Sequence, residues 1–405
     1  MKRILFVDDE PKLLEGLQRL LRPRRKQWEM AFATSGQEAL AILESSRFDM
    51  IVTDMRMPGM DGAELLEHVQ ERFPGVIRVV LSGYVEREAA LRAVPVAHQF
   101  LAKPCDPEVL SAALERSCSL TSALPDDAIR QVVGAVGKLP SLPTTFASLT
   151  SALRDPDVSL GEIGEIIERD VAMTAKVLQL VNSAFFGLVC EVSTVRGAVG
   201  VLGLDTLQHL VLSVAVFHTF RVERSIPGFN LEAFERHSHL AARIAAVLPA
   251  SKPVSSAAVV AALLHDAGKL ILASRLPGQF ELALRTSQKE NRPLHAVEKE
   301  LSRVGHAEIG AYLLGLWGLP PAIVNAVYGH HQPPLADRPV TELDALAITH
   351  IADALAFETE WERSGNGPPP YSLLNAGYVE SLGVTGQLPE WKSVATQALD
   401  RRRSC

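Results

Sequence analysis

The chain has 405 residues, more than one hydrophobic core usually organises, so we expect two domains. Its content of 47% hydrophobic and 21% charged residues excludes a disordered chain. A formal net charge of −7 argues against a duplex-binding surface, which needs clustered Lys and Arg, so we expect no direct DNA binding.

The first 120 residues alternate short apolar runs with segments of helical periodicity. The runs at 4–7, 50–53, 77–81 and 99–102 predict buried strands, and 29–33 predicts a weaker one. Helical spacing is found at 12–21, 36–44, 63–72, 87–93 and 107–119. This alternation predicts an α/β domain over 1–120, a doubly wound five-stranded parallel sheet with helices on both faces. In such sheets ligands bind at the carboxyl ends of the strands.

The remainder of the chain is predicted to be all-α. A stretch rich in Ser, Thr, Pro and Asp places the domain linker at 121–128. Helical patterns then continue over 129–360, where Ser159 and Glu162 have the spacing of a capping box. Breakers at 365–370 leave a C-terminal extension, which we place at 361–405.

The chain shows no secretory or membrane signature. Its four cysteines are scattered without a C-x-x-C pair, which is typical of free thiols in a reducing compartment. Acidic residues at 8–10 interrupt the N-terminus before a signal peptide's apolar stretch could finish. No uninterrupted apolar run approaches the roughly 18 residues of a membrane span. We therefore expect a cytoplasmic protein without a membrane partner.

Chemically active side chains follow four of the predicted strands. In chain order they are Asp8, Asp9, Glu10, Asp54, Ser82 and Lys103. If the sheet is parallel, all of them converge on one edge, where clustered carboxylates favour a hard cation such as Mg²⁺. One carboxylate could then attack a phosphoryl group, while the ammonium and the hydroxyl hold the phosphoryl oxygens. Taken singly, an acidic triplet after a strand is usually a solvated turn; the combination at four strand ends favours the phosphoryl site.

Four motifs resemble those of the response-regulator receiver family. They are VDDE at 7–10, TDMRMPGMDG at 53–62, LSG at 81–83 and FLAKP at 100–104. The resemblance implies these roles: phosphoacceptor Asp54; Mg²⁺ ligands Asp8, Asp9, Asp54 and the backbone carbonyl of Arg56; phosphoryl contacts Ser82 and Lys103; and a reorienting aromatic, Phe100. It further implies a phosphoprotein of a two-component system, with a sensor histidine kinase as phosphate donor. Receivers often associate through helix 4 and strand 5, which is compatible with a homodimer. A degenerate receiver that takes no phosphate is the alternative.

The predicted helical domain contains a second set of candidate ligands. They are His237, His265, Asp266, His306, His330, His331 and Asp353. Imidazole and carboxylate favour Mn, Fe, Zn or Mg over thiolate-preferring metals, and a bound metal could activate water for attack on phosphorus, with Lys269 near the developing charge. The alternative is structural, since histidines at helix ends often cap carbonyls and the double His before Gln332 looks like a helix terminus.

Residues from about 129 to 355 resemble an HDOD domain, the HD-related output domain of bacterial signalling proteins. The segments that carry the resemblance are LPSLP at 139–143, LQLVNSA at 178–184, ALLHDAGK at 262–269, HAEIG at 306–310, WGLP at 317–320 and HIAD at 350–353. One departure is Asp170-Val171, where the family usually has Asp-Pro; the absence of this proline matters little to function. HDOD domains are generally regarded as non-catalytic relatives of HD phosphohydrolases, which implies an output that acts by binding a downstream protein or a nucleotide.

This chain nevertheless keeps the HD ligand pattern, and its His306, His330 and His331 resemble the additional ligands of HD-GYP cyclic-di-GMP phosphodiesterases. It lacks the Asp-Gly-x-Gly-Tyr-Pro signature that follows the double His in those enzymes. The leading hypothesis is therefore a phosphorylation-switched binding output. The alternative is a metal-dependent phosphohydrolase acting on a cyclic dinucleotide or another phosphoester.

Overall fold

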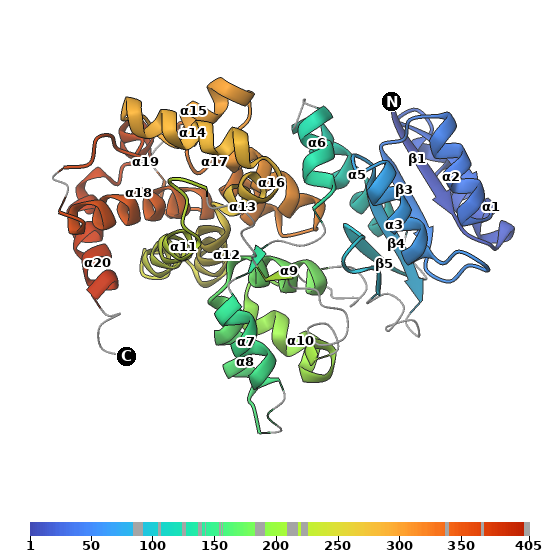
Figure 1. The fold of residues 1–405 in the computed structure, drawn as a ribbon, viewed down its shortest axis with the longest axis horizontal. Coiled ribbons are helices and arrows are strands. Elements are labelled where there is room, and N and C mark those ends of the chain that lie inside the picture. Colours follow the sequence, from blue (N-terminus) through green and yellow to red (C-terminus); the bar gives the residue numbers. More distant parts are fainter. Residues whose placement is uncertain are drawn as a thin grey trace.

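The structure is a computed structural model of the 405-residue chain. It describes residues 1–83, 92–103, 107–123, 127–136, 140–141, 143–153, 155, 157–182, 191–208, 218–219, 226–336, 340–365 and 368–400. Figure 1 shows the five-stranded sheet and its helices on the right, with the helical remainder of the chain to their left and below.

The N-terminal domain is built on a parallel sheet, as predicted. Its strands are β1 (Lys2–Val7), β2 (Trp28–Ala33), β3 (Met50–Asp54), β4 (Ile77–Gly83) and β5 (Gln99–Lys103), in the order β2-β1-β3-β4-β5. The strand order reverses between β1 and β3, and a cleft at such a switch point is where ligands bind in doubly wound sheets. The register places Asp54 beside Leu81 and Gly83 beside Lys103, so the ends of the strands meet at one edge.

Four described helices flank the sheet: α1 (Pro11–Leu20), α2 (Gly36–Ser45), α3 (Gly62–Arg72) and α5 (Pro107–Ala123), with a short 3-10 turn, η1 (Arg22–Arg24). The fully buried strand residues Leu5, Ile51 and Val52 form the centre of this core. The helix predicted at 87–93 falls almost entirely in 84–91, outside the described residues. Helix α5 continues to Ala123, three residues into the predicted linker, and α6 begins at Asp127 within it.

The rest of the chain is helical. Its helices are α6 (Asp127–Gly134), α7 (Pro143–Ala152), α8 (Leu160–Glu168), α9 (Val171–Asn182), α10 (Val195–Gln208), α11 (Leu231–Ala245), α12 (Lys252–Leu264), α13 (Ala267–Arg275), α14 (Pro277–Glu290), α15 (Leu294–Ser302), α16 (His306–Leu316), α17 (Pro321–Gly329), α18 (Ala345–Arg363), α19 (Ala376–Leu382) and α20 (Leu388–Asp400), besides the 3-10 turn η4 (Thr385–Gln387). The predicted capping box at Ser159 opens α8. A two-residue parallel pair, β6 (Pro140–Ser141) with β7 (His218–Thr219), is the only β structure in this part among the described residues.

Residues Lys252–Arg275, which form α12 and α13, are apolar and long enough by composition to cross a membrane. Of their most apolar window, 83% is buried inside the protein, as is usual for the central helices of a helical core. The turn between the two helices carries His265 and Asp266, so this core pair positions two of the candidate ligands.

The predicted C-terminal extension is part of the helical packing. Helix α18 passes the predicted boundary at 360 and ends at Arg363, and α20 then packs back against α11 and α18. The buried guanidinium of Arg78 in β4 connects the sheet domain to the helical domain. It donates to the carbonyl of Val96, just before β5, at 2.5 Å and to the carbonyl of Gly134, at the end of α6, at 2.6 Å. Helix α6, which begins within the predicted linker, is thereby tied to the sheet.

Candidate functional site

The first candidate site lies where β1, β3 and β5 end. The Lys103 ammonium contacts Asp8 Oδ2 at 2.7 Å and also contacts Asp54 Oδ1, so one cation bridges two carboxylates. The remaining oxygens accept backbone donors: Glu10 N–H donates to Asp8 Oδ1 and Arg56 N–H donates to Asp54 Oδ2, both at 2.9 Å. The parallel sheet thus brings Asp8, Asp54 and Lys103 together, as the strand pattern predicted.

The electrostatics of this pocket are set by burial and by Lys103. Burial raises the pKa of Asp54 by more than the hydrogen bond from Lys103 lowers it, and the nearby Asp8 raises it further. Burial also lowers the pKa of Lys103, but its hydrogen bonds to Asp54 and Asp8 outweigh that effect and raise it. The side chain of Asp54 keeps 8% of its surface exposed and that of Lys103 keeps 27%, so the pocket opens to solvent on the lysine side.

The other predicted receiver residues surround this pair. Ser82 is buried at the end of β4, in register with the residue before Lys103, and Phe100 is buried within β5. Asp9 follows Asp8 in the loop after β1 and is half-buried. Gly62 explains part of the motif at 53–62, since a Cβ there would lie 2.2 Å from the carbonyl oxygen of Asp54. Only glycine lets α3 start so close behind Asp54.

These side chains fit a divalent cation. Asp8 and Asp54 present carboxylate oxygens from adjacent strands, and Asp9 adds a third carboxylate beside them. The single positive charge of Lys103 balances only one of the three carboxylates. The remaining negative charge and the oxygen ligands are what a hard cation such as Mg²⁺ prefers. The residues that would hold the ion are Asp8, Asp9 and Asp54, with the carbonyl of Arg56 as the ligand that the family resemblance implies.

The second candidate site lies among six helices of the part of the chain that follows the sheet domain. The predicted residues come from α11 (His237), the turn between α12 and α13 (His265, Asp266), the start of α16 (His306), the turn after α17 (His330, His331) and α18 (Asp353). All seven are brought together. They form two groups, Asp266 with His306, His330 and His331, and His237 with His265 and Asp353; within each group the ligand atoms all lie within 4.8 Å of one another.

The two aspartates connect these groups. Asp353 Oδ1 lies 3.0 Å from His237 Nε2 and 3.5 Å from His265 Nε2, while its Oδ2 lies 3.6 Å from His331 Nδ1. Asp266 Oδ1 lies 3.1 Å from His306 Nε2, and Asp266 Oδ2 lies 3.4 Å from His265 Nε2. The arrangement can hold two cations with Asp266 and Asp353 near both.

The outer nitrogens of four histidines are held by fixed partners. His265 Nδ1 lies 2.6 Å from the carbonyl of Ala262, and His330 Nδ1 lies 2.6 Å from that of Val327. A ring nitrogen that donates to a carbonyl leaves the other nitrogen as an unprotonated ligand atom. Two glutamates that the sequence analysis did not identify do the same for the others: Glu298 for His306 (2.6 Å) and Glu360 for His237 (3.0 Å).

The inner atoms of the cluster provide the test of whether it fits a metal. The buried atoms without a hydrogen bond include His265 Nε2, His330 Nε2, His331 Nδ1, Asp266 Oδ1 and Asp353 Oδ2. Leaving a buried polar atom without a hydrogen bond costs about 1–3 kcal/mol each, so five such atoms within these two groups are unfavourable unless cations bind them. Nitrogen and carboxylate ligands of this kind suit Zn, Mn or Fe.

The charge balance of the cluster points the same way. Burial lowers the pKa of His265 and of His306, but the neighbouring carboxylates outweigh it and raise both to about 9. For His237 the hydrogen bonds to Asp353 and Glu360 likewise overcome burial and raise the pKa to about 10. The carboxylates therefore exceed what Lys269 balances, and the site takes up positive charge, either as protons or as a metal cation.

Lys269 and His295 contact residues of the cluster, and the nearby His350 and the more remote His239 have other partners. The Lys269 ammonium is 2.5 Å from Asp266 Oδ2, and the Lys269 side chain as a whole is 21% exposed. His295 stacks on His331 at 4.0 Å between ring centroids, and burial lowers its pKa to about 4. His350 is structural: it bridges the carbonyl of His330 (2.6 Å) and the backbone N–H of Asn375 (3.0 Å). His239 contacts the carbonyl of Arg169, whereas His209 lies outside the described residues.

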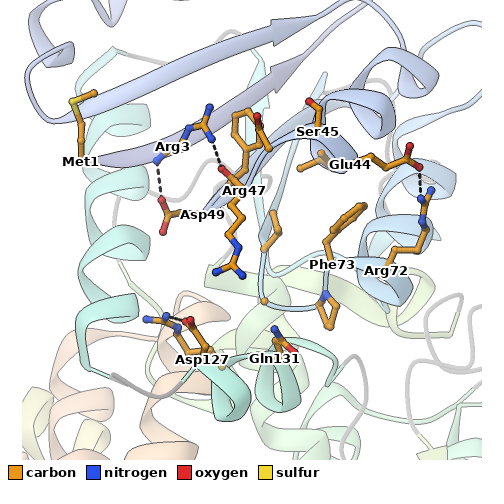
Figure 2. Close-up of a pocket in the computed structure, with 17 residues that line it drawn as sticks. Met1, Arg3, Glu44, Ser45, Arg47, Asp49, Arg72, Phe73, Asp127 and Gln131 are labelled. Atoms are coloured by element: carbon orange, nitrogen blue, oxygen red, sulfur yellow. Dashed lines mark hydrogen bonds and ion pairs between the residues drawn. The ribbon is translucent and has the colours of Figure 1, made fainter.

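A separate groove of about 820 Å³ lies at the amino ends of the strands, between the sheet and α6 (Figure 2). Its arginines are largely paired with acids: Arg3 with Glu29, Arg72 with Glu44 and Arg130 with Asp127. The predicted site residues do not line it. The receiver chemistry is therefore confined to the opposite edge of the sheet.

Comparison with known proteins assigns both halves. The model of the response regulator receiver domain matches residues 4–115, and that of the HDOD domain matches residues 139–333. An uncharacterized protein of Treponema pallidum is 30% identical over 256 residues, which cover 62% of this chain and 48% of that protein. A response regulator receiver protein of Anaeromyxobacter sp. Fw109-5 is 43% identical over 22% of this chain and 37% of that protein. The chain thus spans about half or less of these relatives.

The crystal structure of the MmoQ response regulator from Methylococcus capsulatus Bath has the same fold. It is 24% identical, covers 63% of this chain and 98% of that chain, and superimposes with a TM-score of 0.50. The fold and the two matched domains define the chain as a response regulator. More specifically, it belongs to the response regulators in which a receiver domain is followed by an HDOD output domain.

Proposed function

We propose that this protein is a phosphorylation-switched regulator in which Asp54 accepts a phosphoryl group and the HDOD domain acts by binding a downstream protein or a nucleotide. The observation that carries the proposal is the Lys103 ammonium held against both Asp8 and Asp54 at the solvent-facing edge of the sheet. A receiver implies a phosphate donor, and a sensor histidine kinase is the donor that we propose.

In the proposed reaction an Asp54 carboxylate oxygen attacks the phosphorus of a phosphohistidine. The new oxygen–phosphorus bond forms as the phosphorus–nitrogen bond breaks, and the freed imidazole nitrogen takes up a proton. Lys103, released from Asp54, holds a phosphoryl oxygen, and Ser82 holds another. A divalent cation at Asp8 and Asp9, when bound, neutralises charge on the transferred group.

The seven His and Asp residues of the second candidate site form the output cluster. Their burial supports a binding role for this domain over turnover of a phosphoester. His265, Asp266, His306 and Asp353 are each no more than 3% exposed, whereas His237 is 16% exposed and the adjoining Lys269 is 21% exposed. The altered segment after the double His, where Gln332 accepts a hydrogen bond from Lys299, also differs from the HD-GYP signature.

Labelling with acetyl [³²P]phosphate and Mg²⁺ tests the phosphoacceptor. We expect the wild type to be labelled, EDTA to prevent labelling and Asp54→Asn to abolish it. The matched control is Asp49→Asn, a change of the same kind at the other end of β3, where Asp49 accepts the backbone N–H of Arg3. Equal labelling of the Asp54 and Asp49 variants would overturn the proposal.

A second candidate function is metal-dependent phosphoester hydrolysis at the output cluster. The observation that favours it is the set of buried ligand atoms without hydrogen bonds, with Lys269 beside them to stabilise developing negative charge. The test is metal analysis of the purified protein together with turnover of cyclic-di-GMP and other phosphodiesters. Metal-dependent turnover that His265→Ala/Asp266→Ala abolishes would establish hydrolysis, whereas metal binding without turnover would favour the binding role.

A further inference from the structure

Helix α16 begins at the second candidate site and ends against β5, the strand whose other end carries Lys103 of the first site. Its first residue, His306, belongs to the output cluster, and the carbonyl of its last residue, Leu316, accepts a hydrogen bond from Gln99 Nε2 at 3.1 Å. Gln99 is the first residue of β5, and Lys103, which contacts Asp54, is the last. Strand β5 and helix α16, joined by the Gln99 side chain, therefore connect the first candidate site at Asp54 to the second candidate site at His306.

The junction between β5 and α16 is specific. The carbonyls in the last turn of a helix lack partners within the helix, and Gln99 supplies one for α16. The same amide donates to Ser117 Oγ of α5 at 3.0 Å, so Gln99 fastens α16 to two elements of the receiver. Gly318, with φ of +74°, turns the chain away directly after α16.

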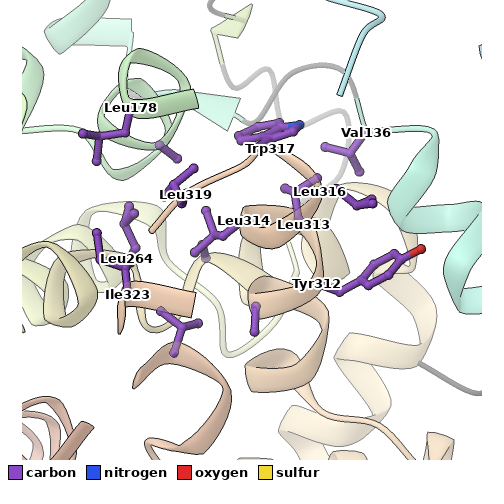
Figure 3. Close-up of a cluster of buried hydrophobic side chains, with 14 of the residues drawn as sticks. Val136, Leu178, Leu264, Tyr312, Leu313, Leu314, Leu316, Trp317, Leu319 and Ile323 are labelled. Atoms are coloured by element: carbon purple, nitrogen blue, oxygen red, sulfur yellow. The ribbon is translucent and has the colours of Figure 1, made fainter. Parts of the chain in front are cut away.

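Side chains of α9 hold the segment just before β5. The buried Lys176 donates to the carbonyl of Val94 at 3.0 Å and lies 4.7 Å from the centre of the Trp317 ring, and Gln179 donates to the carbonyl of His98 at 3.1 Å. Figure 3 shows Trp317 and Leu316 within a close-packed cluster that also includes Val136 and Leu178. Packing of this density transmits small displacements because it has no free volume to absorb them.

The other end of α16 is equally constrained. A Cβ on Gly268 of α13 would lie 1.9 Å from the carbonyl oxygen of His306, so the two helices are in direct backbone contact. Asp266 immediately precedes α13, and His306 Nε2 lies 3.1 Å from Asp266 Oδ1 and 2.9 Å from His331 Nε2. A shift of α16 along α13 would therefore change the spacing of these ligand atoms.

We propose that α16 couples the two sites, so that a phosphoryl group on Asp54 changes the metal affinity of the output cluster through the Gln99–Leu316 hydrogen bond. This inference rests on the proposed phosphorylation of Asp54. Thermodynamic linkage makes the coupling reciprocal. If phosphorylation changes the metal affinity by a given factor, metal binding changes the phosphorylation equilibrium by the same factor. Couplings between distant sites are typically about 5- to 150-fold, which is the range expected here.

The test is a Zn²⁺ titration against a chromophoric chelator in excess Mg²⁺, with and without beryllofluoride as a phosphoryl mimic. We expect beryllofluoride to change the Zn²⁺ affinity of the wild type by at least about fivefold. Gln99→Leu, which removes the amide donor at similar volume, is expected to bind Zn²⁺ and beryllofluoride but to lose this shift. The matched control is Gln70→Leu, because Gln70 also donates from the receiver to a carbonyl beyond α6, that of Ala135 at 3.2 Å, without touching α16.

A second readout needs no variant. The beryllofluoride affinity in excess Mg²⁺ is expected to differ by the same factor between Zn²⁺-loaded and Zn²⁺-free wild type. A wild type that binds both ligands with no shift in either measurement would overturn the coupling while leaving the proposed function in place. So would a cluster that binds no Zn²⁺, or a Gln99→Leu protein that keeps the full shift. Failure to label Asp54 would instead overturn the proposed function.

Discussion

Protonation of one buried histidine at the domain junction should weaken the fold at low pH. His98 is fully buried before β5; its Nδ1 accepts the backbone N–H of Arg78 at 3.0 Å, and its ring contacts the carbonyl of Gly134. Burial holds the pKa of His98 well below its usual range, and the positive charges of Arg78 and Lys176 lower it further. The folded protein therefore keeps His98 neutral, whereas the unfolded chain takes up a proton near pH 6.5.

The sign and the size follow from this difference. A base with a lowered pKa in the folded state stabilises the protein fully above its unfolded pKa, and that stability is lost as the pH falls below about 6.5. For a histidine with an unfolded pKa of about 6.5, the proton-binding polynomial of the unfolded state is about ten times larger at pH 5.5 than at pH 7.5. The loss is therefore about 1.4 kcal/mol, as long as the folded state binds no proton.

Urea denaturation of the wild type and of His98→Asn at the two pH values provides the assay. Asn keeps an acceptor close to the position of Nδ1 but cannot be protonated, so we expect the variant to lose about 1.4 kcal/mol less than the wild type over this interval. The contributions of all other groups cancel in the difference. An equal loss in both proteins would refute the reasoning, since it would mean that His98 is protonated equally in both states.

Four further outcomes are expected. Gly268→Ala should destabilise the protein by about 1–3 kcal/mol or more in chemical denaturation and lower its metal content, because the new Cβ meets the His306 backbone; normal values would contradict the close approach. Trp317→Ala should cost about 3–5 kcal/mol, since the ring is 1% exposed, and a loss under 1 kcal/mol would be inconsistent with that packing. Removing bound metal with a chelator should lower the melting temperature, with a free-energy loss of about 4 kcal/mol at a metal concentration 1,000 times the Kd, and no change would count against metal binding. Ser159→Ala should cost about 1 kcal/mol through the lost cap of α8, and a neutral result would exclude the capping box.

The receiver site could be predicted because it depends on strand ends. Short apolar runs marked the strands, and a parallel sheet necessarily places the residues after them at one edge. Asp8, Asp54 and Lys103 follow three such runs, and the structure brings them into contact. The candidate ligands of the helical domain were also predicted by residue type, but only the fold shows that residues from six helices meet.

The supporting residues could not be predicted in the same way. Glu298 lies eight residues before His306 and reaches it only because α15 ends and the chain turns back. Glu360 lies at the edge of the predicted domain, and the sequence predicts an extension after it, whereas α20 in that region packs on α11 and α18. Gln99 opens a predicted strand, yet its partner Leu316 is 217 residues away, and no local pattern marks such a pair.

Peptide mass spectrometry after borohydride reduction of the acetyl-phosphate-treated protein locates the phosphorylated residue chemically, because reduction converts an aspartyl phosphate to homoserine. Homoserine is expected at position 54, the last residue of β3, and only when Mg²⁺ is present. Homoserine at Asp8 or Asp9 instead, or at no position, would contradict the account.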